Sequence, residues 1–233
     1  DSFLRTVVAE TLQVELPESY AVGVVMMSTD DELRGKAKSI LEEELANQGL
    51  AVIGWREVPT DNSCLGPIAL ESLPAFEQVF IAPGDIADEQ KFTARLYMGR
   101  RKAEKRLETD DSFHIASFGT NILSYKGLMM PADIAGFYLD LADVRMETAI
   151  CVFHQRFSTN TFPSWPLAHP YRYVAHNGEI NTVQGNQNWM RAREALAASP
   201  LLPNLHKAFP ICTDGASDTA RFDEVLELLH LAG

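Results

Sequence analysis

The sequence is poor in cysteine and in positive charge, and it has no long hydrophobic run. Its three cysteines, Cys64, Cys151 and Cys212, are odd in number, widely spaced and form no C-x-x-C pair. This pattern excludes a cysteine-rich zinc site or an iron–sulfur motif within these residues, and it favours a reducing compartment over a disulfide framework. The longest apolar run, residues 20–27, is far shorter than the roughly 20 residues that span a bilayer.

The shortage of positive charge argues against polyanionic partners. The chain has 20 basic and 32 acidic residues, a formal net charge of −12. Such a surface repels nucleic acid phosphates and anionic membranes, so we expect neither as a partner. The sequence starts at Asp1 without an initiator Met, a signal peptide or a transit peptide. We interpret it as part of a longer polypeptide, cytoplasmic or, in a photosynthetic eukaryote, plastidic.

The hydrophobic content, 46%, is enough for one domain over residues 1–233 with its own core. Short apolar or alternating runs predict strands at 20–27, 51–55, 78–81, 113–119, 122–125 and 149–153. Apolar residues at helical spacing predict helices at 29–49, 87–107, 188–198 and 222–231, with another starting near Pro131. Thr29 and Glu32 form a candidate capping box, and Gly49 is a fitting stop. This order indicates a layered α/β or α+β domain.

The predicted helix at 87–107 has an apolar face and a strongly basic face. The apolar face contains Phe92, Leu96, Ala103 and Leu107. The basic side chains, expected to face solvent and nearby acids, are Lys91, Arg95, Arg100, Arg101, Lys102, Lys105 and Arg106.

Chemistry concentrates in residues 154–186, which are dense in Asn, His, Ser, Thr and aromatic residues. Arg156 follows the predicted strand 149–153 directly, which would fix its guanidinium in place. The planar guanidinium suits a carboxylate ligand through two parallel hydrogen bonds. A structural ion pair is an equally good interpretation of Arg156.

The dipeptide Asn177–Gly178 has two interpretations. Between alternating residues, Asn-Gly predicts a type I′ hairpin turn. An asparagine amide beside a glycine N–H can instead donate hydrogen bonds to an oxyanion.

Ser217, Asp218 and Thr219 precede the last predicted helix. Either Ser217 or Asp218 would make a good N-cap, whereas the Asp218 carboxylate could instead hold a ligand's ammonium. The spacings of His154, His169 and His176 match no helical metal-binding motif, so we expect no metal.

The order of these elements is more specific than any one of them. Arg156-x-Ser158-Thr159, then Ala168-His169-Pro170, then His176-Asn177-Gly178, then Ser217-Asp218-Thr219 resembles the class II glutamine amidotransferases. The longer string FHQRFSTNTFPSWPLAHPYRYVAHNGEINTVQGN is similar to the glutamate synthases within that family. So are GWREVP at 54–59, YKG at 125–127 and FYLDL at 137–141, so the resemblance covers almost the whole chain.

The resemblance implies an α+β N-terminal-nucleophile hydrolase fold, a four-layer α/β/β/α sandwich with two antiparallel sheets. It implies that Arg156 binds the α-carboxylate of glutamine and Asp218 its α-ammonium. It implies that Asn177 and Gly178 form the oxyanion hole. The pocket lining implied is Ser158, Thr159 and His169.

The same resemblance implies parts that these residues do not contain. The family's nucleophile is an N-terminal cysteine in a Cys-Gly start, and none of the three cysteines has that context. We therefore expect the amidotransferase domain here to be incomplete at its N-terminal end and to continue beyond residue 233.

In the complete enzyme, the resemblance implies that ammonia from glutamine passes to synthase domains of the same polypeptide. There FMN and an iron–sulfur cluster support reductive conversion of 2-oxoglutarate to glutamate, with electrons from a pyridine-nucleotide-dependent subunit or ferredoxin. No residue in this sequence is expected to bind those cofactors. The alternatives are another class II amidotransferase and an amino-acid-binding sensor that lacks the nucleophile.

Overall fold

The computed structural model describes residues 1–155 and 162–233, which build around one four-stranded antiparallel sheet. The strand order is β2 (Ala51–Glu57), β3 (Ala75–Ala82), β1 (Ala21–Met27) and β4 (His114–Gly119). All seven residues of the central strand β1 are buried, which explains why its sequence is a continuous apolar run. The four strands at these places and the α+β class are confirmed.

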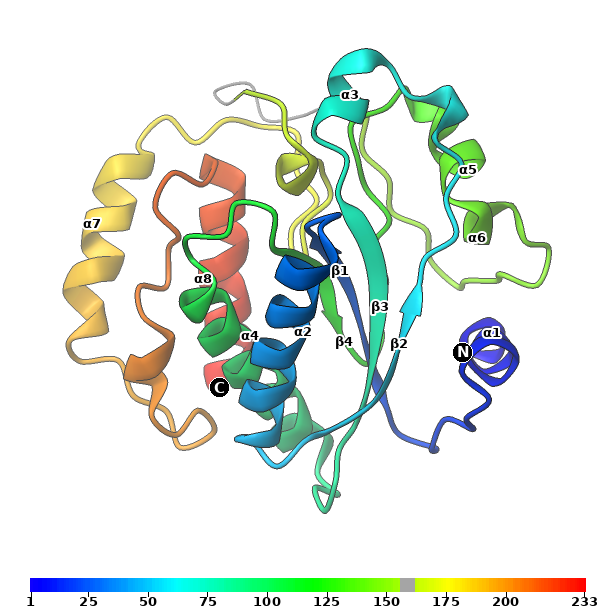
Figure 1. The fold of residues 1–233 in the computed structure, drawn as a ribbon. Helices are drawn as coiled ribbons and strands as arrows, with labels where there is room; N and C mark the ends of the chain where they lie inside the picture. Colours follow the sequence, from blue (N-terminus) through cyan, green and yellow to red (C-terminus); the bar gives the residue numbers. More distant parts are fainter. Residues whose placement is uncertain (156–161) are drawn as a thin grey trace.

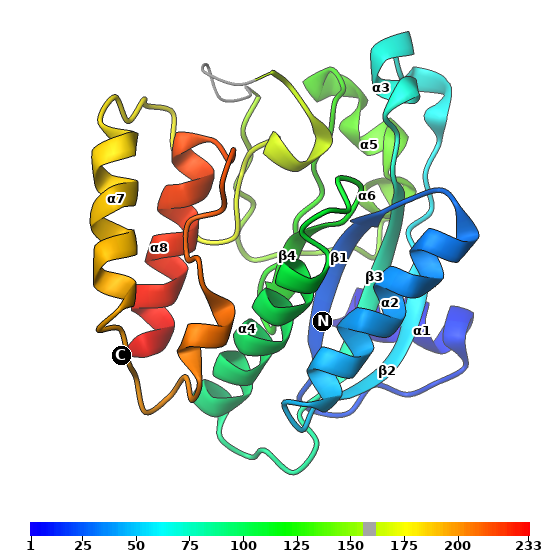
Figure 2. The same cartoon turned by 60° about the vertical axis from the view of Figure 1, so that its left-hand side comes forward.

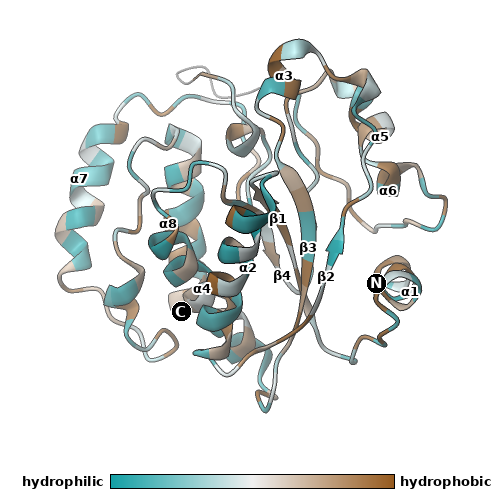
Figure 3. Ribbon diagram, in the orientation of Figure 1, coloured by the Kyte–Doolittle hydropathy of each residue, from teal (hydrophilic) through white to brown (hydrophobic). Residues whose placement is uncertain are grey.

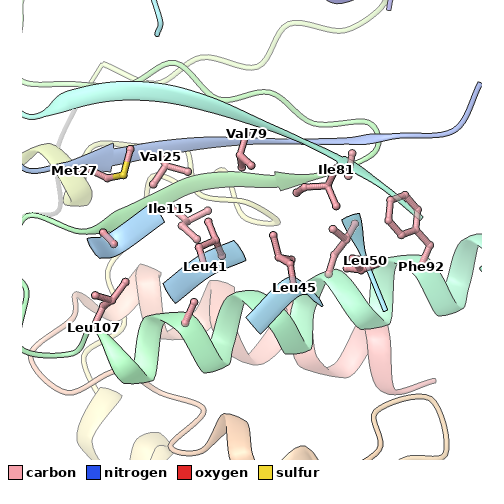
Figure 4. Packing of buried hydrophobic residues seen from close by; sticks show 14 residues of the cluster. Val25, Met27, Leu41, Leu45, Leu50, Val79, Ile81, Phe92, Leu107 and Ile115 are labelled. Carbon is pink, nitrogen blue, oxygen red and sulfur yellow. The ribbon is translucent and has the colours of Figure 1, made fainter. Parts of the chain in front are cut away.

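Helices α2 (Asp31–Ala46) and α4 (Glu89–Arg106) cover one face of the sheet (Figure 1). Figure 4 shows how Val25 and Val79 of the strands meet Leu41 and Leu45 of α2. Phe92 and Leu96 of α4 belong to the same buried cluster. The predicted apolar face of the helix at 87–107 is therefore correct.

The opposite face of the sheet packs on α1 (Ser2–Leu12) and on short helical segments. These segments are η1 (Asn62–Cys64), α3 (Pro67–Glu71), η2 (Pro131–Asp133), α5 (Ile134–Phe137), α6 (Leu139–Ala142) and η3 (Trp165–Leu167). Phe76 of β3 meets the rings of Phe137, Tyr138 and Trp165 at centroid distances of 5.7, 5.4 and 5.5 Å. Through Trp165, this aromatic cluster holds the start of the chain segment that continues to His169 and the other candidate site residues.

A further layer lies outside α4, as Figure 2 shows, and consists of α7 (Val183–Glu194), η4 (Leu205–Ala208) and α8 (Asp218–Ala232). Tyr97 and Met98 of α4 pack against Leu228 and Leu231 of α8. Helix α4 is thus covered on two sides, by the sheet and by α8. In Figure 3 hydrophilic and hydrophobic residues alternate along these helices, as expected where one face is buried.

Burial on two sides overturns one prediction about α4. Arg100 and Arg101, expected on a solvated face, are 0% and 7% exposed. Arg100 Nη2 donates to Glu227 Oε2 of α8 at 2.5 Å, and Arg101 Nη2 donates to the carbonyl oxygen of Pro210 at 2.6 Å. A buried guanidinium is costly unless it is paired, and the paired carboxylates come from Glu227 and Glu224 of α8 and from Glu104 of α4 itself.

Several local predictions were also wrong. Residues 122–125 and 149–153 form no strand, and Ile150 and Phe153 are 79% and 78% exposed. A strand needs a neighbouring edge for its backbone groups, and in the part of the chain that is described these residues have none. The cap of α2 is Asp30 rather than Thr29, because its Oδ1 accepts the Glu32 and Leu33 N–H groups.

At the ends of the other helices the outcome is mixed. Gly49, with φ +77°, follows α2 as predicted. Helix α7 starts five residues before the predicted 188–198 helix, at Val183, and α8 starts at Asp218 instead of 222. The second sheet of the implied four-layer sandwich is not among the described residues, and that arrangement stays a prediction.

Candidate functional site

The candidate site residues fall in two groups. Arg156, Ser158 and Thr159 lie outside the described residues, so their predicted roles are not tested. His169, Asn177, Gly178 and Asp218 are described. The segment 173–180 and the N-terminus of α8 bring Asn177, Gly178 and Asp218 together, as the following contacts show.

Segment 173–180 is attached to α8 at both ends by carboxylates that accept backbone N–H groups. Asp223 Oδ1 accepts the N–H groups of Tyr173 and Val174, at 2.6 and 2.9 Å. Asp218 Oδ2 accepts the N–H of Ile180 at 2.8 Å. The exposed residues Asn177 and Gly178 lie between these two attachments.

These contacts decide against the hairpin interpretation of Asn177–Gly178. No strand is assigned between residues 171 and 182, and neither Asn177 nor Gly178 has a positive φ. A type I′ turn requires positive φ at both central residues. The backbone donors that a hairpin would pair across strands are given instead to carboxylates of α8.

The Gly178 N–H, one of the two predicted oxyanion donors, has a local partner in this conformation. It donates to His176 Nδ1 at 3.0 Å. A Cβ added at Gly178 would lie 2.7 Å from His176 Cε1, so glycine permits this close approach. The Gly178 N–H therefore donates to the His176 side chain near the surface, and a ligand oxygen can take the place of that side chain as acceptor.

At the start of α8, Ser217 is the N-cap and Asp218 is the first helical residue. Ser217 Oγ accepts the Ala220 N–H at 3.1 Å and lies 3.0 Å from the Tyr171 hydroxyl oxygen. The Asp218 carboxylate is 9% exposed, at the helix end that favours negative charge. The N-cap prediction is thus resolved for Ser217, and the Asp218 carboxylate accepts the Ile180 N–H through Oδ2 and the Thr219 N–H through Oδ1.

Asp218 also borders a cavity of the described residues. That cavity, about 470 Å³, lies between α7 and α8 and is lined by apolar residues such as Met190, Phe222 and Val225. Its volume is in the range of small-molecule sites. Asn177 and Gly178 do not line it. Asp218 therefore contacts segment 173–180 and also borders a cavity large enough for an amino acid.

His169 lies on the other side of the site, before the cis His169–Pro170 peptide bond. Its ring centroid is 4.6 Å from that of His154 and 4.8 Å from that of Tyr171. Burial, and next the nearby His154, lower the pKa of His169 to about 4, so the ring is neutral at pH 7. Neither ring nitrogen has a hydrogen-bond partner among the described residues, which suits a residue that lines a ligand pocket.

Lys126, singled out in the sequence only as part of a resemblance, is a functional candidate that sequence reasoning missed. It is 2% exposed, its Nζ donates to the Pro166 carbonyl oxygen at 2.7 Å, and the same Nζ lies 4.9 Å from the centroid of the Tyr171 ring. With His154 and His169 it lines a small cavity of about 40 Å³. Loss of hydration, and next the charge of Arg172, lower the pKa of Lys126 to about 7.

The lowered pKa of Lys126 predicts a pH-dependent stability. Above pH 7 the folded chain has lost this proton while the unfolded chain keeps it up to about pH 10. Unfolding then takes up a proton, so the free energy of unfolding rises with pH by up to about 1.4 kcal/mol per unit. Lys126→Met should lack this contribution.

Urea unfolding of wild type and Lys126→Met between pH 6 and 10 measures the effect. The difference in the free energy of unfolding between the two proteins should shift in favour of wild type as the pH rises above 7. Lys36→Met, at an exposed lysine of α2, is the matched control and should give a flat difference. A flat difference for Lys126→Met as well would contradict the assigned burial effect.

The described residues contain no group of three His, Cys, Asp or Glu side chains that could hold a metal ion. Within the same residues, no helix is both long and apolar enough to cross a membrane.

A family model described as glutamine amidotransferases class-II matches residues 1–233. The chain therefore belongs to the class II glutamine amidotransferases.

Curated relatives narrow the similarity to glutamate synthases. Glutamate synthase [NADPH] large chain of Bacillus subtilis is 40% identical over 238 residues, which cover 100% of this chain and 16% of that protein. Glutamate synthase [NADH] of Saccharomyces cerevisiae is 39% identical over 236 residues, 95% of this chain and 11% of the yeast protein.

A third relative is the chloroplastic ferredoxin-dependent glutamate synthase of Oryza sativa, which is 38% identical over 218 residues. The match covers 91% of this chain and 13% of the rice protein. The chain thus spans only about a seventh of the length of these relatives.

Proposed function

We propose that this chain is the glutaminase part of a glutamate synthase, releasing ammonia from the side-chain amide of glutamine. The observation that carries the proposal is the attachment of segment 173–180 to α8, because it holds Asn177 and Gly178 close to Asp218. An oxyanion donor pair and a carboxylate in one site match the two ends of glutamine, its amide carbonyl and its α-ammonium.

Each group has a role in this proposal. Asp218 holds the α-ammonium and Arg156 the α-carboxylate, which fixes the amide relative to the nucleophile. Ser158, Thr159 and the neutral His169 line the pocket.

The Asn177 side-chain amide and the Gly178 N–H stabilise the oxyanion of the tetrahedral intermediate. Because Gly178 N–H donates to His176 Nδ1 in the structure, His176 holds this donor until the oxyanion replaces it.

We assign the nucleophile to a cysteine outside these 233 residues, preceding Asp1. Cys64 lies in η1, and Cys212 is buried with its pKa raised to about 11 by desolvation, so its reactive thiolate is scarce. Cys151 is exposed and precedes the site by several residues. We also expect the second sheet and the four-layer sandwich in the complete domain.

The rest of the proposed reaction lies in other parts of the polypeptide. Ammonia would pass through an internal tunnel to synthase domains, where 2-oxoglutarate is converted to glutamate. An iron–sulfur cluster does not fit the described residues, since its usual cysteine ligands must converge and the three cysteines lie in separate parts of the chain. The electron donor differs among the relatives, whose names specify NADH, NADPH or ferredoxin. We place the enzyme in the cytoplasm, or in a plastid if the source is photosynthetic.

The proposed clamp predicts that Arg156→Lys and Asp218→Asn each raise KM for glutamine by about 10- to 100-fold. Each replaces a charge-assisted contact worth roughly 1.5–3 kcal/mol, and lysine cannot reproduce the bidentate guanidinium. Initial rates of glutamate release by the full-length protein measure both constants.

Two neighbouring substitutions are matched controls for the clamp. Arg191→Lys and Asp214→Asn change the same residue types at exposed positions on α7 and in the loop before α8, and should leave KM unchanged. Near-wild-type KM in both clamp variants would return Arg156 and Asp218 to structural roles. Another class II amidotransferase would bind glutamine with the same clamp. The acceptor of the ammonia is therefore identified by a separate measurement, the formation of glutamate from 2-oxoglutarate.

A further inference from the structure

Helix α8 supplies a second carboxylate, Asp223, whose position has a consequence for the oxyanion donors. Its side chain is 0% exposed, in a chain where acidic residues are usually at the surface. A buried carboxylate is costly unless hydrogen bonds and a counter-charge compensate it. The contacts of Asp223 therefore indicate what the residue is for.

Asp223 uses one oxygen for the backbone and the other for a cation. Oδ1 accepts the N–H groups of Tyr173 and Val174, at 2.6 and 2.9 Å. Oδ2 lies 3.5 Å from Arg172 Nη2, whose Nη1 also donates to the Ile115 carbonyl oxygen of β4 at 3.1 Å. The carboxylate thus links α8, strand β4 and the start of segment 173–180.

Helix α8 is itself fixed to the core below Asp223. Glu227 Oε2 accepts from Arg100 Nη2 at 2.5 Å, and Glu224 Oε1 lies 3.4 Å from Arg101 Nη1. Both arginines belong to α4, which packs directly on the sheet. A displacement of segment 173–180 relative to the sheet must therefore break contacts to a rigid helix.

We propose that Asp223 is a positioning residue that sets the place of Asn177 and Gly178 for the reaction. This inference rests on the proposed glutaminase function. Asp218 fixes the segment at Ile180 and Asp223 fixes it at Tyr173 and Val174, so the two donors are held from both sides. Small errors in the place of an oxyanion donor reduce rate more than substrate binding, because charge develops only in the transition state.

The test compares Asp223→Asn with Glu227→Gln in the full-length protein. Both substitutions neutralise a buried carboxylate of α8 that faces Arg172, but only Asp223 touches the 173–180 segment. Asp223→Asn should lower kcat for glutamine hydrolysis by about tenfold with KM little changed. Glu227→Gln should lower Tm by a similar amount but reduce kcat much less than Asp223→Asn does, because Glu227 acts on the segment only through helix α8.

Two additions make every outcome decisive. Asp223→Glu keeps the charge but moves the carboxylate by one methylene, so it tests the same geometry if Asp223→Asn does not fold. Amide hydrogen exchange in segment 173–180 should accelerate in both Asp223 variants and not in Glu227→Gln. Amide hydrogen exchange tests whether Asp223 positions the segment even if the wild type releases no glutamate. The absence of glutamate release would overturn only the proposed function. Equal kcat losses in Asp223 and Glu227 variants, or unchanged exchange in Asp223→Glu, would overturn the inference.

Discussion

The 233-residue chain by itself is expected to release no glutamate from glutamine above the uncatalysed rate. The groups proposed to bind glutamine and stabilise an oxyanion are not enough, because covalent catalysis also needs an activated nucleophile. The buried Cys212, with its raised pKa, and the separate Cys64 and Cys151 do not provide one. Adding the native sequence that precedes Asp1 should restore turnover, measured as glutamate release.

The control for this prediction is the chain in which Cys64, Cys151 and Cys212 are all replaced by serine. It should bind glutamine as the unmodified chain does and should be equally inactive. Circular dichroism and a cooperative melting transition establish that both proteins are folded. Turnover by the unmodified chain that persists in the triple variant would refute the missing-nucleophile hypothesis, and inactivity of the extended protein would support the sensor alternative.

Asn177→Ala should lower kcat of the full-length protein by roughly 10²–10³-fold, about 3–4 kcal/mol, with little change in KM. An oxyanion donor contributes where negative charge develops and much less to the neutral amide of the substrate. The structure makes this substitution cleaner than the sequence suggested. Asn177 is exposed and has no positive φ, so alanine introduces no backbone strain.

Asn181→Ala is the matched control, because it removes the same side-chain amide from another exposed position four residues further along. Its kcat, KM and Tm should all stay near wild type. Steady-state kinetics and thermal melting of the two variants side by side separate the oxyanion role from a structural one. Normal turnover by a stable Asn177→Ala protein would remove Asn177 from the proposed oxyanion hole.

Local sequence patterns predicted the elements whose burial follows from neighbours close in the chain. The continuous apolar run at β1 indicates a strand buried on both faces, and the helical spacing of Phe92 and Leu96 indicates one buried face of α4, so local patterns were sufficient. The same reasoning failed for residues 149–153, because an apolar run becomes a strand only when another strand pairs with it. It failed again at Arg100, since a single helix does not reveal that two other layers will cover it.

The candidate site shows the same division. Residue types and their order were enough to select Asp218, Asn177 and Gly178, because a carboxylate and amide donors have recognisable chemistry. Whether Asn177–Gly178 is a hairpin was decided by Asp218 and Asp223, which are 38 or more residues away from the backbone groups they accept. Lys126 and Asp223 carry no local signal at all, since a lysine or aspartate in a sequence is expected at the surface.

The sequence by itself determined the four strands, helices α2 and α4, the approximate places of α7 and α8, and the family, and it selected the candidate site residues. The tertiary structure alone decided that α8 holds segment 173–180, that Arg100 and Arg101 are buried, and that Lys126 lies under the Tyr171 ring. The physical reason is the range of the interactions involved. Periodicity and capping act within a few residues, whereas the desolvation and pairing of buried charges depend on partners that only the folded chain brings together.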